Sequence, residues 1–181
     1  MSKNTKLIIL NGPVGVGKTT IAERIHELFS PSYLLSCDAI RRFTNDYHNL
    51  PHEGRGLRNK IVLSMLDVLM AENMTTILEQ LHTDANMLDK YHEIAKKHGI
   101  EVYEYFLWME DKDAYLNRFN ERDQGPTKHP DSSLTMQRAS NYWDSMKHFT
   151  LGRNASTTIV TDELSIEETT SKLMGLLEGQ T

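Results

Sequence analysis

The sequence predicts an α/β protein in which a parallel sheet carries helices on both faces. Short apolar runs typical of strands alternate about five times with amphipathic segments at helical spacing. The first of these runs is continuously apolar, which is typical of a strand that is covered on both faces. The chain has no internal repeat, low-complexity tract or obvious linker, so residues 1–181 are expected to form one domain.

The first strand and helix are expected near the start of the chain. The apolar run at residues 7–11 predicts the strand, and helical spacing predicts a helix from Thr19 that the segment Ser30-Pro31 ends. The expected apolar stripe of this helix consists of Ile21, Ile25, Leu28 and Phe29. Residues 32–38 predict a second short strand that ends near Asp38.

The next segment is expected to be irregular before regular structure resumes. Residues 39–56 contain Asn, Pro and two Gly among charged residues, which is typical of irregular structure. Residues 57–72 predict a helix. Its expected inward face consists of Leu57, Ile61, Met65, Leu66 and Leu69. Residues 74–80 predict the third strand.

Capping signals mark both ends of the following helix. Thr83 or Asp84 is expected to cap a helix that runs to His98 and stops at Gly99. Residues 100–109 then predict the fourth strand.

The last third of the chain predicts three helices and one strand. Helices are expected over residues 111–122 and 133–146, and the fifth strand over residues 156–161. Ser165 and Glu168 match a capping box, which predicts the start of the final helix.

Composition and charge restrict the function classes. The chain is 39% hydrophobic and 25% charged, which is ordinary for a globular protein, and its net charge is −5 with neutral histidines. A negative net charge argues against a general nucleic-acid binder, because neutralising phosphates requires a basic surface. Cys37 is the single cysteine, which excludes an internal disulfide and suits a reducing compartment.

No targeting or membrane-spanning segment is expected in this sequence. Lys3 and Lys6 precede only about five apolar residues before Asn11 and Gly12, which is too few for a secretory signal. No stretch approaches the roughly 20 apolar residues of a transmembrane helix. We therefore expect a soluble, cytoplasmic protein without a membrane partner.

A glycine-rich loop after the first strand carries the most specific signal. The run Gly12-Pro13-Val14-Gly15-Val16-Gly17-Lys18-Thr19 fits the phosphate-binding pattern G-x-x-x-x-G-K-[ST], and we include the adjacent Thr20 in the expected nucleotide site. Glycines allow backbone N–H groups to approach phosphate oxygens, and the following helix N-terminus adds positive charge. Lys18 can bridge the outer phosphates, and the Thr19 hydroxyl can ligate Mg²⁺.

The alternative for this loop is a glycine turn without a ligand. A chance match in a chain of this length has odds of roughly one per cent, so we expect the loop to bind a nucleoside triphosphate. The guanine-recognition motif N-K-x-D does not occur in the sequence, which argues against a GTPase. The chain is short for a motor ATPase, and no apolar strand ends in an Asp-Glu pair. Phosphoryl transfer to an acceptor is therefore the favoured use of the nucleotide.

The end of the second strand supplies candidates for the acceptor site. Parallel-sheet proteins bind ligands beyond the carboxyl ends of their strands, so Asp38 is expected beside the glycine loop. Asp38 could accept a proton from a substrate hydroxyl, and Arg41, one helical turn later, could bind an anionic part of the substrate. Spacing alone leaves open the alternative that Asp38 caps a helix and Arg41 is a surface charge.

The end of the third strand supplies a second carboxylate. Glu79 could hold a Mg²⁺-bound water or a substrate hydroxyl. The alternative interpretation is that Glu79 lies at a solvated strand end without a chemical role. His82 follows three residues later, and we favour the interpretation that it packs in the structure without a chemical role.

Two arginines before a polar loop predict a mobile lid over roughly residues 118–132. Arg118 and Arg122 are spaced i, i+4 on one helix face, just before residues 123–133, which are rich in Pro and Gly. They could close over the phosphates and neutralise charge that develops during transfer, with Arg122 as the favoured contact. The alternative is a solvated helix face with Arg122 paired to a carboxylate. Lys128 and Arg138 are further candidate phosphate ligands.

The chain resembles the small P-loop kinases of the adenylate-kinase-like group. The segments GPVGVGKTT, SCDAIRR, NRFNERD and TTIVTDELSIEETTSKL occur in the order that this group uses. The resemblance implies a three-layer P-loop NTPase fold with a five-stranded parallel sheet of order 2-3-1-4-5, ATP as the donor and a mobile lid. Adenylate kinases carry Asp-Gly-Phe-Pro-Arg after the third strand, whereas this chain has LEQLHTD, so a nucleoside monophosphate acceptor is less expected.

Within that group, the chain looks similar to phosphotransferases of the chloramphenicol-phosphotransferase and tunicamycin-resistance type. The opening ILNGPVGVGKT and the segment LFSPSYLL carry the similarity to the tunicamycin-resistance type. Asp38 matches the position of the base in the chloramphenicol enzymes. Asp38 and Arg41 together fit the D-x-x-R of polynucleotide 5′-hydroxyl kinases.

These observations predict an ATP- and Mg²⁺-dependent kinase that phosphorylates a hydroxyl of a small molecule. Residues 39–60 and 80–90 are expected to line the acceptor pocket. Two alternatives stay open. One is a polynucleotide 5′-hydroxyl kinase, whose candidate basic channel consists of Arg41, Arg42, Arg55, Arg58 and Lys60. The other is a regulatory protein that binds ATP, hydrolyses it slowly and signals through a partner.

Overall fold

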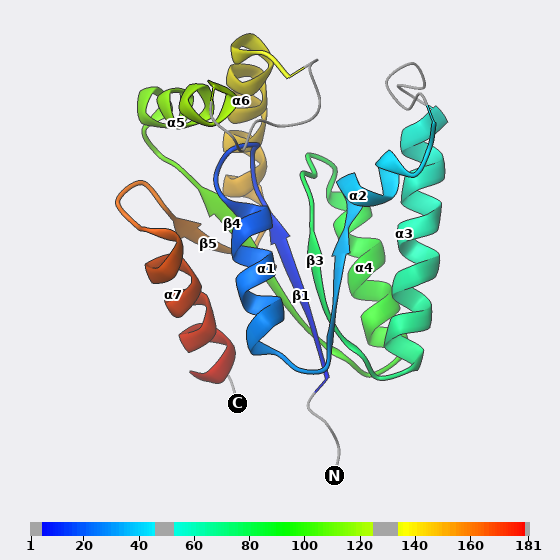
Figure 1. The fold of residues 1–181 in the computed structure, drawn as a ribbon. Helices are drawn as coiled ribbons and strands as arrows, with labels where there is room; N and C mark the ends of the chain where they lie inside the picture. The colour runs from blue at the N-terminus through cyan, green and yellow to red at the C-terminus, as the bar shows by residue number, and fades with distance from the viewer. Residues whose placement is uncertain (1–4, 46–52, 125–133, 180–181) are drawn as a thin grey trace.

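The computed structural model describes residues 5–45, 53–124 and 134–179, and at its centre lies a five-stranded sheet (Figure 1). Every strand pairing is parallel, and the strand order is β2-β3-β1-β4-β5. The strands are β1 (Lys6–Asn11), β2 (Ser32–Ser36), β3 (Thr75–Glu79), β4 (Glu101–Trp108) and β5 (Thr157–Val160). The predicted α/β fold and the strand order 2-3-1-4-5 are both confirmed.

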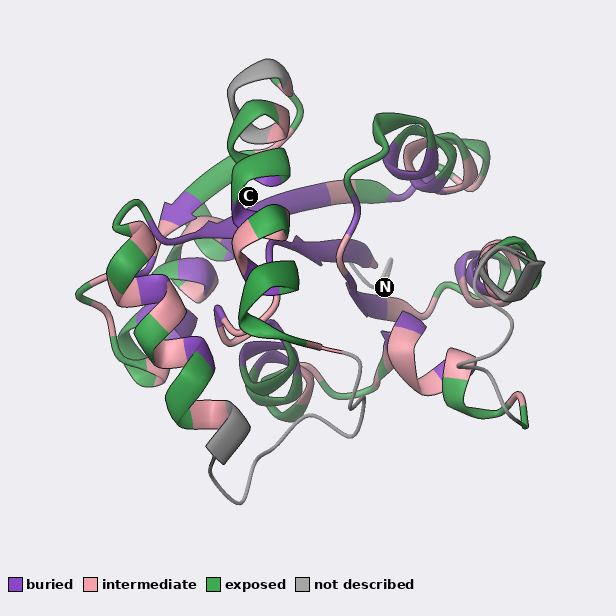
Figure 2. Ribbon diagram, turned by 90° about the horizontal axis from the view of Figure 1, so that it is seen from above, coloured by how far each residue is buried: buried purple, intermediate pink, exposed green. Residues whose placement is uncertain are grey.

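Helices cover both faces of the sheet. One face carries α1 (Lys18–Leu28) and α7 (Ile166–Gly179), and the other carries α3 (Glu53–Ala71) and α4 (Ala85–Lys97) (Figure 1). Figure 2 shows the buried strands as a layer between these helices.

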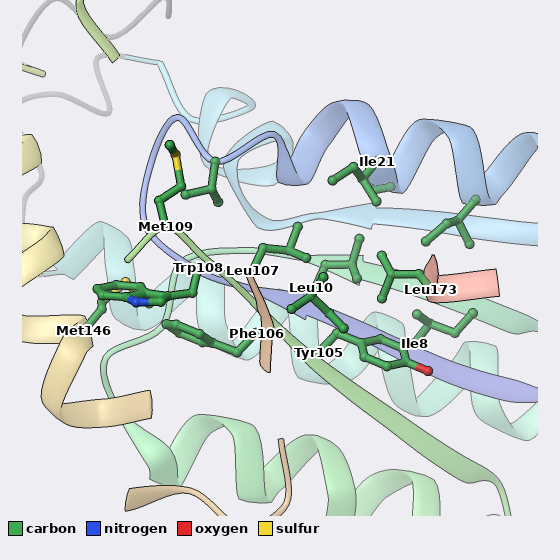
Figure 3. Close-up of a cluster of buried hydrophobic side chains, with 14 of the residues drawn as sticks. Ile8, Leu10, Ile21, Tyr105, Phe106, Leu107, Trp108, Met109, Met146 and Leu173 are labelled. Carbon is green, nitrogen blue, oxygen red and sulfur yellow. The ribbon is translucent and has the colours of Figure 1, made fainter. Parts of the chain in front are cut away.

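Alternate residues of β1 belong to two separate hydrophobic clusters. The cluster toward α1 and α7 includes Ile8, Leu10, Ile21 and Leu173 (Figure 3). The cluster toward α3 and α4 includes Leu7, Ile9, Leu66 and Leu88. Because successive strand residues point to opposite faces of a sheet, a continuous apolar run requires a helix layer on each side. This burial holds the end of β1, and the glycine loop that follows it, in a fixed place.

Three further helices lie at the carboxyl end of the sheet, where β1 leads into the glycine loop (Figure 1). These are α2 (Cys37–Arg42), α5 (Lys112–Gln124) and α6 (Met136–Gly152). The indole of Trp143 on α6 stacks on Trp108 with ring centroids 5.0 Å apart, and its Nε1 donates to the Met109 carbonyl at 2.8 Å. These contacts fix α6 against the end of β4, from which α5 departs.

The structure corrects the prediction for the second strand and the segment after it. β2 ends at Ser36 rather than near Asp38, because the Ser36 hydroxyl accepts a hydrogen bond from the Ala39 N–H at 3.3 Å and caps α2. Part of the segment that was expected to be irregular is helical, because it contains most of α2 and because α3 begins early, at Glu53. Residues 46–52 of that segment lie outside the described residues.

The expected buried faces of two helices are also partly wrong. The buried face of α3 contains Val62, Leu66 and Met70. Leu57 and Ile61, which were expected to point inward, are 52% and 38% exposed. α3 carries apolar residues around much of its circumference, so packing on the sheet and α4 selects the face. On α1, Ile21 and Ile25 are buried as expected, but Leu28, the last residue of the helix, is 61% exposed.

The predicted helix caps are confirmed. Asp84 caps α4 by accepting a hydrogen bond from the Asn86 N–H at 2.9 Å. Ser165 and Glu168 form the capping box of α7, with reciprocal side-chain to backbone hydrogen bonds of 3.2 and 2.9 Å. α6 extends to Gly152, beyond the expected end at residue 146. Within the described ranges, none of the helices is long and apolar enough to span a membrane.

Candidate active site

A cleft of about 390 Å³ opens at the carboxyl end of the sheet. The glycine loop with the start of α1 forms its floor, α2 and the end of β3 form one wall, and α5 forms the other. The lining residues are Val14, Gly15, Gly17, Lys18, Thr19, Thr20, Ser36, Asp38, Arg41, Arg42, Glu79, Leu81, Arg118, Arg122 and Ile166. Cationic side chains outnumber carboxylates among them, so the cleft suits an anionic ligand such as a triphosphate.

The glycine loop requires glycine at two positions. Gly12 has φ +147°, and a Cβ there would collide with the carbonyl oxygen of Leu107 on β4. Gly17, immediately before α1, has φ +95°, and a Cβ there would lie 3.0 Å from Ile166 Cδ1. Both residues therefore keep the loop close to its surroundings in a backbone conformation that side chains disfavour. The predicted loop members Gly12, Pro13 and Val16 do not line the cleft; Val16 is buried in the core beneath it.

Lys18 lies folded over the loop. Its Nζ donates to the Pro13 carbonyl at 2.8 Å, and the side chain is largely buried. Burial lowers the pKa of Lys18 below its ordinary value; the Glu79 and Asp38 carboxylates oppose this shift, whereas the Arg122 guanidinium adds to it. The lysine thus lies within electrostatic reach of groups on both walls of the cleft.

Thr19 and Glu79 bring together oxygen atoms of the kind that Mg²⁺ prefers. The Thr19 hydroxyl donates to Glu79 Oε1 at 3.2 Å, and the Glu79 side chain is buried at the end of β3. No cluster of three or more metal-binding side chains occurs in the part of the chain that the structure describes. A cation here would need further oxygens from a bound phosphate, which is how Mg²⁺ usually enters a nucleotide site.

α2 brings Asp38 and Arg41 to the cleft, as predicted. Ser36 is the N-cap of α2, so the alternative that Asp38 caps this helix is wrong. Asp38 instead lies in the first turn and lines the cleft together with Arg41, which is half-buried, and Arg42.

The two predicted lid arginines also reach the cleft. Arg118 and Arg122 line its α5 wall, and Arg118 Nη1 lies 3.9 Å from the sulfur of Met109. Arg122 forms no ion pair with any residue that the structure describes. The remainder of the predicted lid, residues 125–132 with Lys128, lies outside the described residues. Arg138 is exposed on α6 and is not among the lining residues.

His82 belongs to a buried polar network rather than to the cleft lining. Its ring nitrogen Nε2 lies 3.0 Å from the Tyr91 hydroxyl, which donates to Gln80 Oε1 at 3.0 Å. Cys37 Sγ donates to the same oxygen. Burial lowers the pKa of His82 to about 3, so the ring is neutral at physiological pH. This agrees with the favoured interpretation of His82 as a packing residue.

The candidate basic channel for a polynucleotide is only partly assembled. Arg41 and Arg42 line the cleft, whereas Arg58 and Lys60 on α3 are not among the lining residues. The guanidinium of Arg58 donates twice to Asn59 Oδ1, at 3.1 and 2.7 Å. The side chain of Arg55 lies outside the described residues.

Sequence reasoning missed Ser36 and Asn11. Ser36 donates to Glu79 Oε1 at 3.0 Å, and Asn11 at the end of β1 joins the glycine loop to His82. A hydroxyl directly before the Cys37-Asp38 pair was the available signal for Ser36. Asn11 directly precedes the glycine motif, which was the corresponding signal for that residue.

Several solved structures share this fold. The tunicamycin resistance protein of Deinococcus radiodurans has a TM-score of 0.64 and 19% identity, with 96% of this chain and 95% of that chain covered. Shikimate kinase of Acinetobacter baumannii, solved with shikimate, has a TM-score of 0.65 and 21% identity, with coverages of 98% and 95%. A sugar kinase of Janibacter has a TM-score of 0.66 and 16% identity, with coverages of 96% and 95%. At these identities the likeness establishes the fold alone.

A search of curated proteins finds no significant match. A family model described as an AAA domain, in contrast, matches residues 7–141, from the first strand through the cleft-lining helices to the start of α6. The match covers most of the chain, and the chain therefore belongs to this AAA domain family, here in the form of a kinase-like P-loop fold.

Proposed function

We propose that this protein is a kinase that transfers the γ-phosphoryl group of Mg·ATP to a hydroxyl of a small molecule. One observation carries the proposal: Lys18 of the glycine loop, Asp38 of α2 and Arg122 of α5 line one cleft, and both Asp38 and Arg122 act electrostatically on Lys18. A donor site, a candidate base and a candidate charge-stabilising group thus converge.

The donor would bind along the floor of the cleft. Backbone N–H groups of the glycine loop and Lys18 would bind the outer phosphates, supported by the positive N-terminal end of α1. Thr19 would ligate Mg²⁺, with Glu79 accepting the Thr19 proton and so keeping a lone pair available. When bound, Mg²⁺ would offset negative charge on the phosphate oxygens.

The transfer step would use groups from both walls. Asp38 would accept the proton of the acceptor hydroxyl while the oxygen of that hydroxyl forms a bond to the γ-phosphorus. The bond between the γ-phosphorus and the leaving ADP oxygen would break. Arg41 would bind a polar part of the acceptor. Arg122, with Arg118, would stabilise charge on the transferred group.

The acceptor is proposed to be a small molecule rather than a polynucleotide. Of the described basic residues considered for a nucleic-acid channel, Arg41 and Arg42 line the cleft, whereas Arg58 and Lys60 lie outside it. The negative net charge of the chain points the same way. Shikimate kinase and a sugar kinase among the similar structures act on small molecules by their names.

The proposal is tested by incubating the protein with γ-labelled Mg·ATP and a metabolite extract supplemented with 5′-hydroxyl oligonucleotides. Label in a small organic product, formed by the native protein and not by Asp38→Asn, is the expected result. Label in the oligonucleotides would replace the proposal with polynucleotide kinase activity. Label only in free phosphate, unchanged by Asp38→Asn, would replace it with a slow nucleotide hydrolase that has a regulatory role.

A further inference from the structure

The Ser36 side chain lies between the carboxylate of Glu79 and the start of α2. Its hydroxyl donates to Glu79 Oε1 at 3.0 Å and accepts from the Ala39 N–H at 3.3 Å. Ser36 and Glu79 are also direct partners in the parallel pairing of β2 with β3. A hydroxyl has one proton and two acceptor lone pairs, so both hydrogen bonds form together.

These bonds extend a path that begins at the glycine loop. Glu79 Oε1, which accepts the Ser36 proton, also accepts the Thr19 proton at 3.2 Å. Thr19 is the second residue of α1, directly after the loop, and Asp38 lies two residues beyond Ser36. The path therefore joins the expected metal ligand to the helix that carries the candidate base.

α2 is short enough to depend on such a contact. It has only six residues, and a helix of that length has little stability of its own in water. Besides its cap, α2 is held by Cys37, which is buried and whose thiol donates to Gln80 Oε1, and by Ile40, which is buried in the cluster that includes α3. A change in the bonds of Glu79 would reach α2 through Ser36.

We propose that Ser36 is a positioning residue that couples Mg·ATP in the glycine loop to the order of α2. Thr19, as a ligand of bound Mg²⁺, would hold the Glu79 carboxylate in place through their hydrogen bond, and the Ser36 hydroxyl would hold the first turn of α2 with Asp38 facing the cleft. Donor binding thus prepares the acceptor wall. This inference rests on the proposed Mg·ATP binding, and its test needs no acceptor.

Cys37 provides the measurement, because it is the single cysteine and is buried at the first residue of α2. Reaction with a thiol reagent requires α2 to open, so its rate reports the order of this helix. In the native protein, saturating Mg·ATP should slow the reaction at least about fivefold, the lower end of typical coupling between sites. ATP with EDTA should slow it much less.

Two variants separate the coupling from the cap. Ser36→Gly removes the donor to Glu79 but retains most of the capping preference, because Gly is itself well tolerated at an N-cap. We expect it to bind Mg·ATP without slowing the Cys37 reaction. Ser36→Thr keeps the hydroxyl and should restore the slowing. The control Thr135→Ala removes the cap of α6, also a 3.3 Å hydrogen bond, and should behave like the native protein.

Each outcome is decisive. Native-like slowing in Ser36→Gly would overturn the inference, because the nucleotide would then shield Cys37 by itself. Equal slowing by ATP with EDTA in the native protein would overturn it even if Ser36→Gly does not fold. Binding of Mg·ATP without slowing in the native protein would overturn the coupling and leave the proposed function standing. If the native protein does not bind Mg·ATP, the proposed function fails as well.

Discussion

The Asn11 side chain joins the glycine loop to the backbone of His82, beyond the end of β3. Its Oδ1 accepts from the Gly12 N–H at 2.9 Å and from the His82 N–H at 2.8 Å, and its Nδ2 donates to the His82 carbonyl at 3.1 Å. The side chain is fully buried. One amide therefore fixes the loop that would hold the donor relative to the segment beside the acceptor wall.

Replacing Asn11 should destabilise the protein strongly. Asn11→Ala would leave three buried backbone groups without these hydrogen bonds, and each unsatisfied group costs about 1–3 kcal/mol. We expect a loss of about 3 kcal/mol in the free energy of unfolding, measured by urea denaturation. The control Asn141→Ala removes an exposed hydrogen bond to Gln137 on α6 and should change stability by less than about 0.5 kcal/mol. Equal losses in the two variants would refute the bridging role of Asn11.

The buried charge of Lys18 should lower the free energy of unfolding of the nucleotide-free protein. Because burial lowers its pKa, the unfolded chain binds this proton more tightly than the folded chain does. The resulting cost is fully present below the folded pKa and diminishes as pH rises through the folded pKa towards the ordinary value of 10.5. We therefore expect Lys18→Met to raise the melting temperature of the nucleotide-free protein.

The same variant should lose stabilisation by the donor. At a Mg·ATP concentration of 100 Kd the native protein gains about 2.7 kcal/mol, whereas Lys18→Met should gain little at that concentration. Thermal unfolding with and without Mg·ATP measures both effects. Lys90→Met, on the exposed side of α4, should match the native protein in each. A variant that still gains the native increment would show that Lys18 does not bind the phosphates.

Glu104 on β4 should make stability sensitive to acid. Its carboxylate is buried and accepts hydrogen bonds from Arg153 at 2.6 and 2.8 Å and lies 2.8 Å from His92 Nε2. Burial alone would raise the pKa of Glu104, but the hydrogen bonds from His92 and Arg153 outweigh burial and hold the pKa below its ordinary value. The carboxylate therefore contributes stability above pH 4.5, which is lost as pH falls through the lower folded value.

Glu104→Gln should remove this dependence and cost about 3 kcal/mol, because the Arg153 guanidinium loses its buried partner and keeps its ion pair with the exposed Asp89 carboxylate. Unfolding free energies between pH 3 and pH 7 measure the effect. Asp144→Asn breaks the exposed pair with Lys112 and should cost less than about 1 kcal/mol, with little change in the acid dependence. A Glu104→Gln profile parallel to that of the native protein would contradict the assignment.

The predictable features of this fold are local in sequence. The glycine motif is contiguous, and the strand runs and the Ser165–Glu168 capping box span a few residues, so they could be predicted directly. Ser36 and Glu79 meet only because β2 and β3 are in register, 43 residues apart. The inward face of α3 likewise depends on what it packs against, since Leu57 and Val62 are equally apolar in the sequence.

The roles of the two lid arginines should differ. Arg122 lies close enough to Lys18 to lower the pKa of that lysine, and it therefore acts where the outer phosphates of the donor are expected. The guanidinium of Arg118 instead lies against the Met109 sulfur, at the base of α5. Arg122 is thus better placed to stabilise charge on the transferred phosphoryl group, whereas Arg118 is placed to support binding.

Arg122→Ala should lower kcat about 10²- to 10³-fold, with a small change in the affinity for Mg·ATP. Arg118→Ala should weaken Mg·ATP binding more than it lowers kcat. Once the acceptor is found, steady-state kinetics and nucleotide titrations on both variants measure the contrast. Arg24→Ala, which removes an exposed pair with Glu27 on α1, should leave both quantities unchanged. Arg122→Lys keeps the positive charge but loses the bidentate geometry of arginine. Relative to Arg122→Ala, it should recover part of the lost kcat if charge dominates, and none if the bidentate geometry is needed. A larger loss of kcat in Arg118→Ala than in Arg122→Ala would reverse the two assignments.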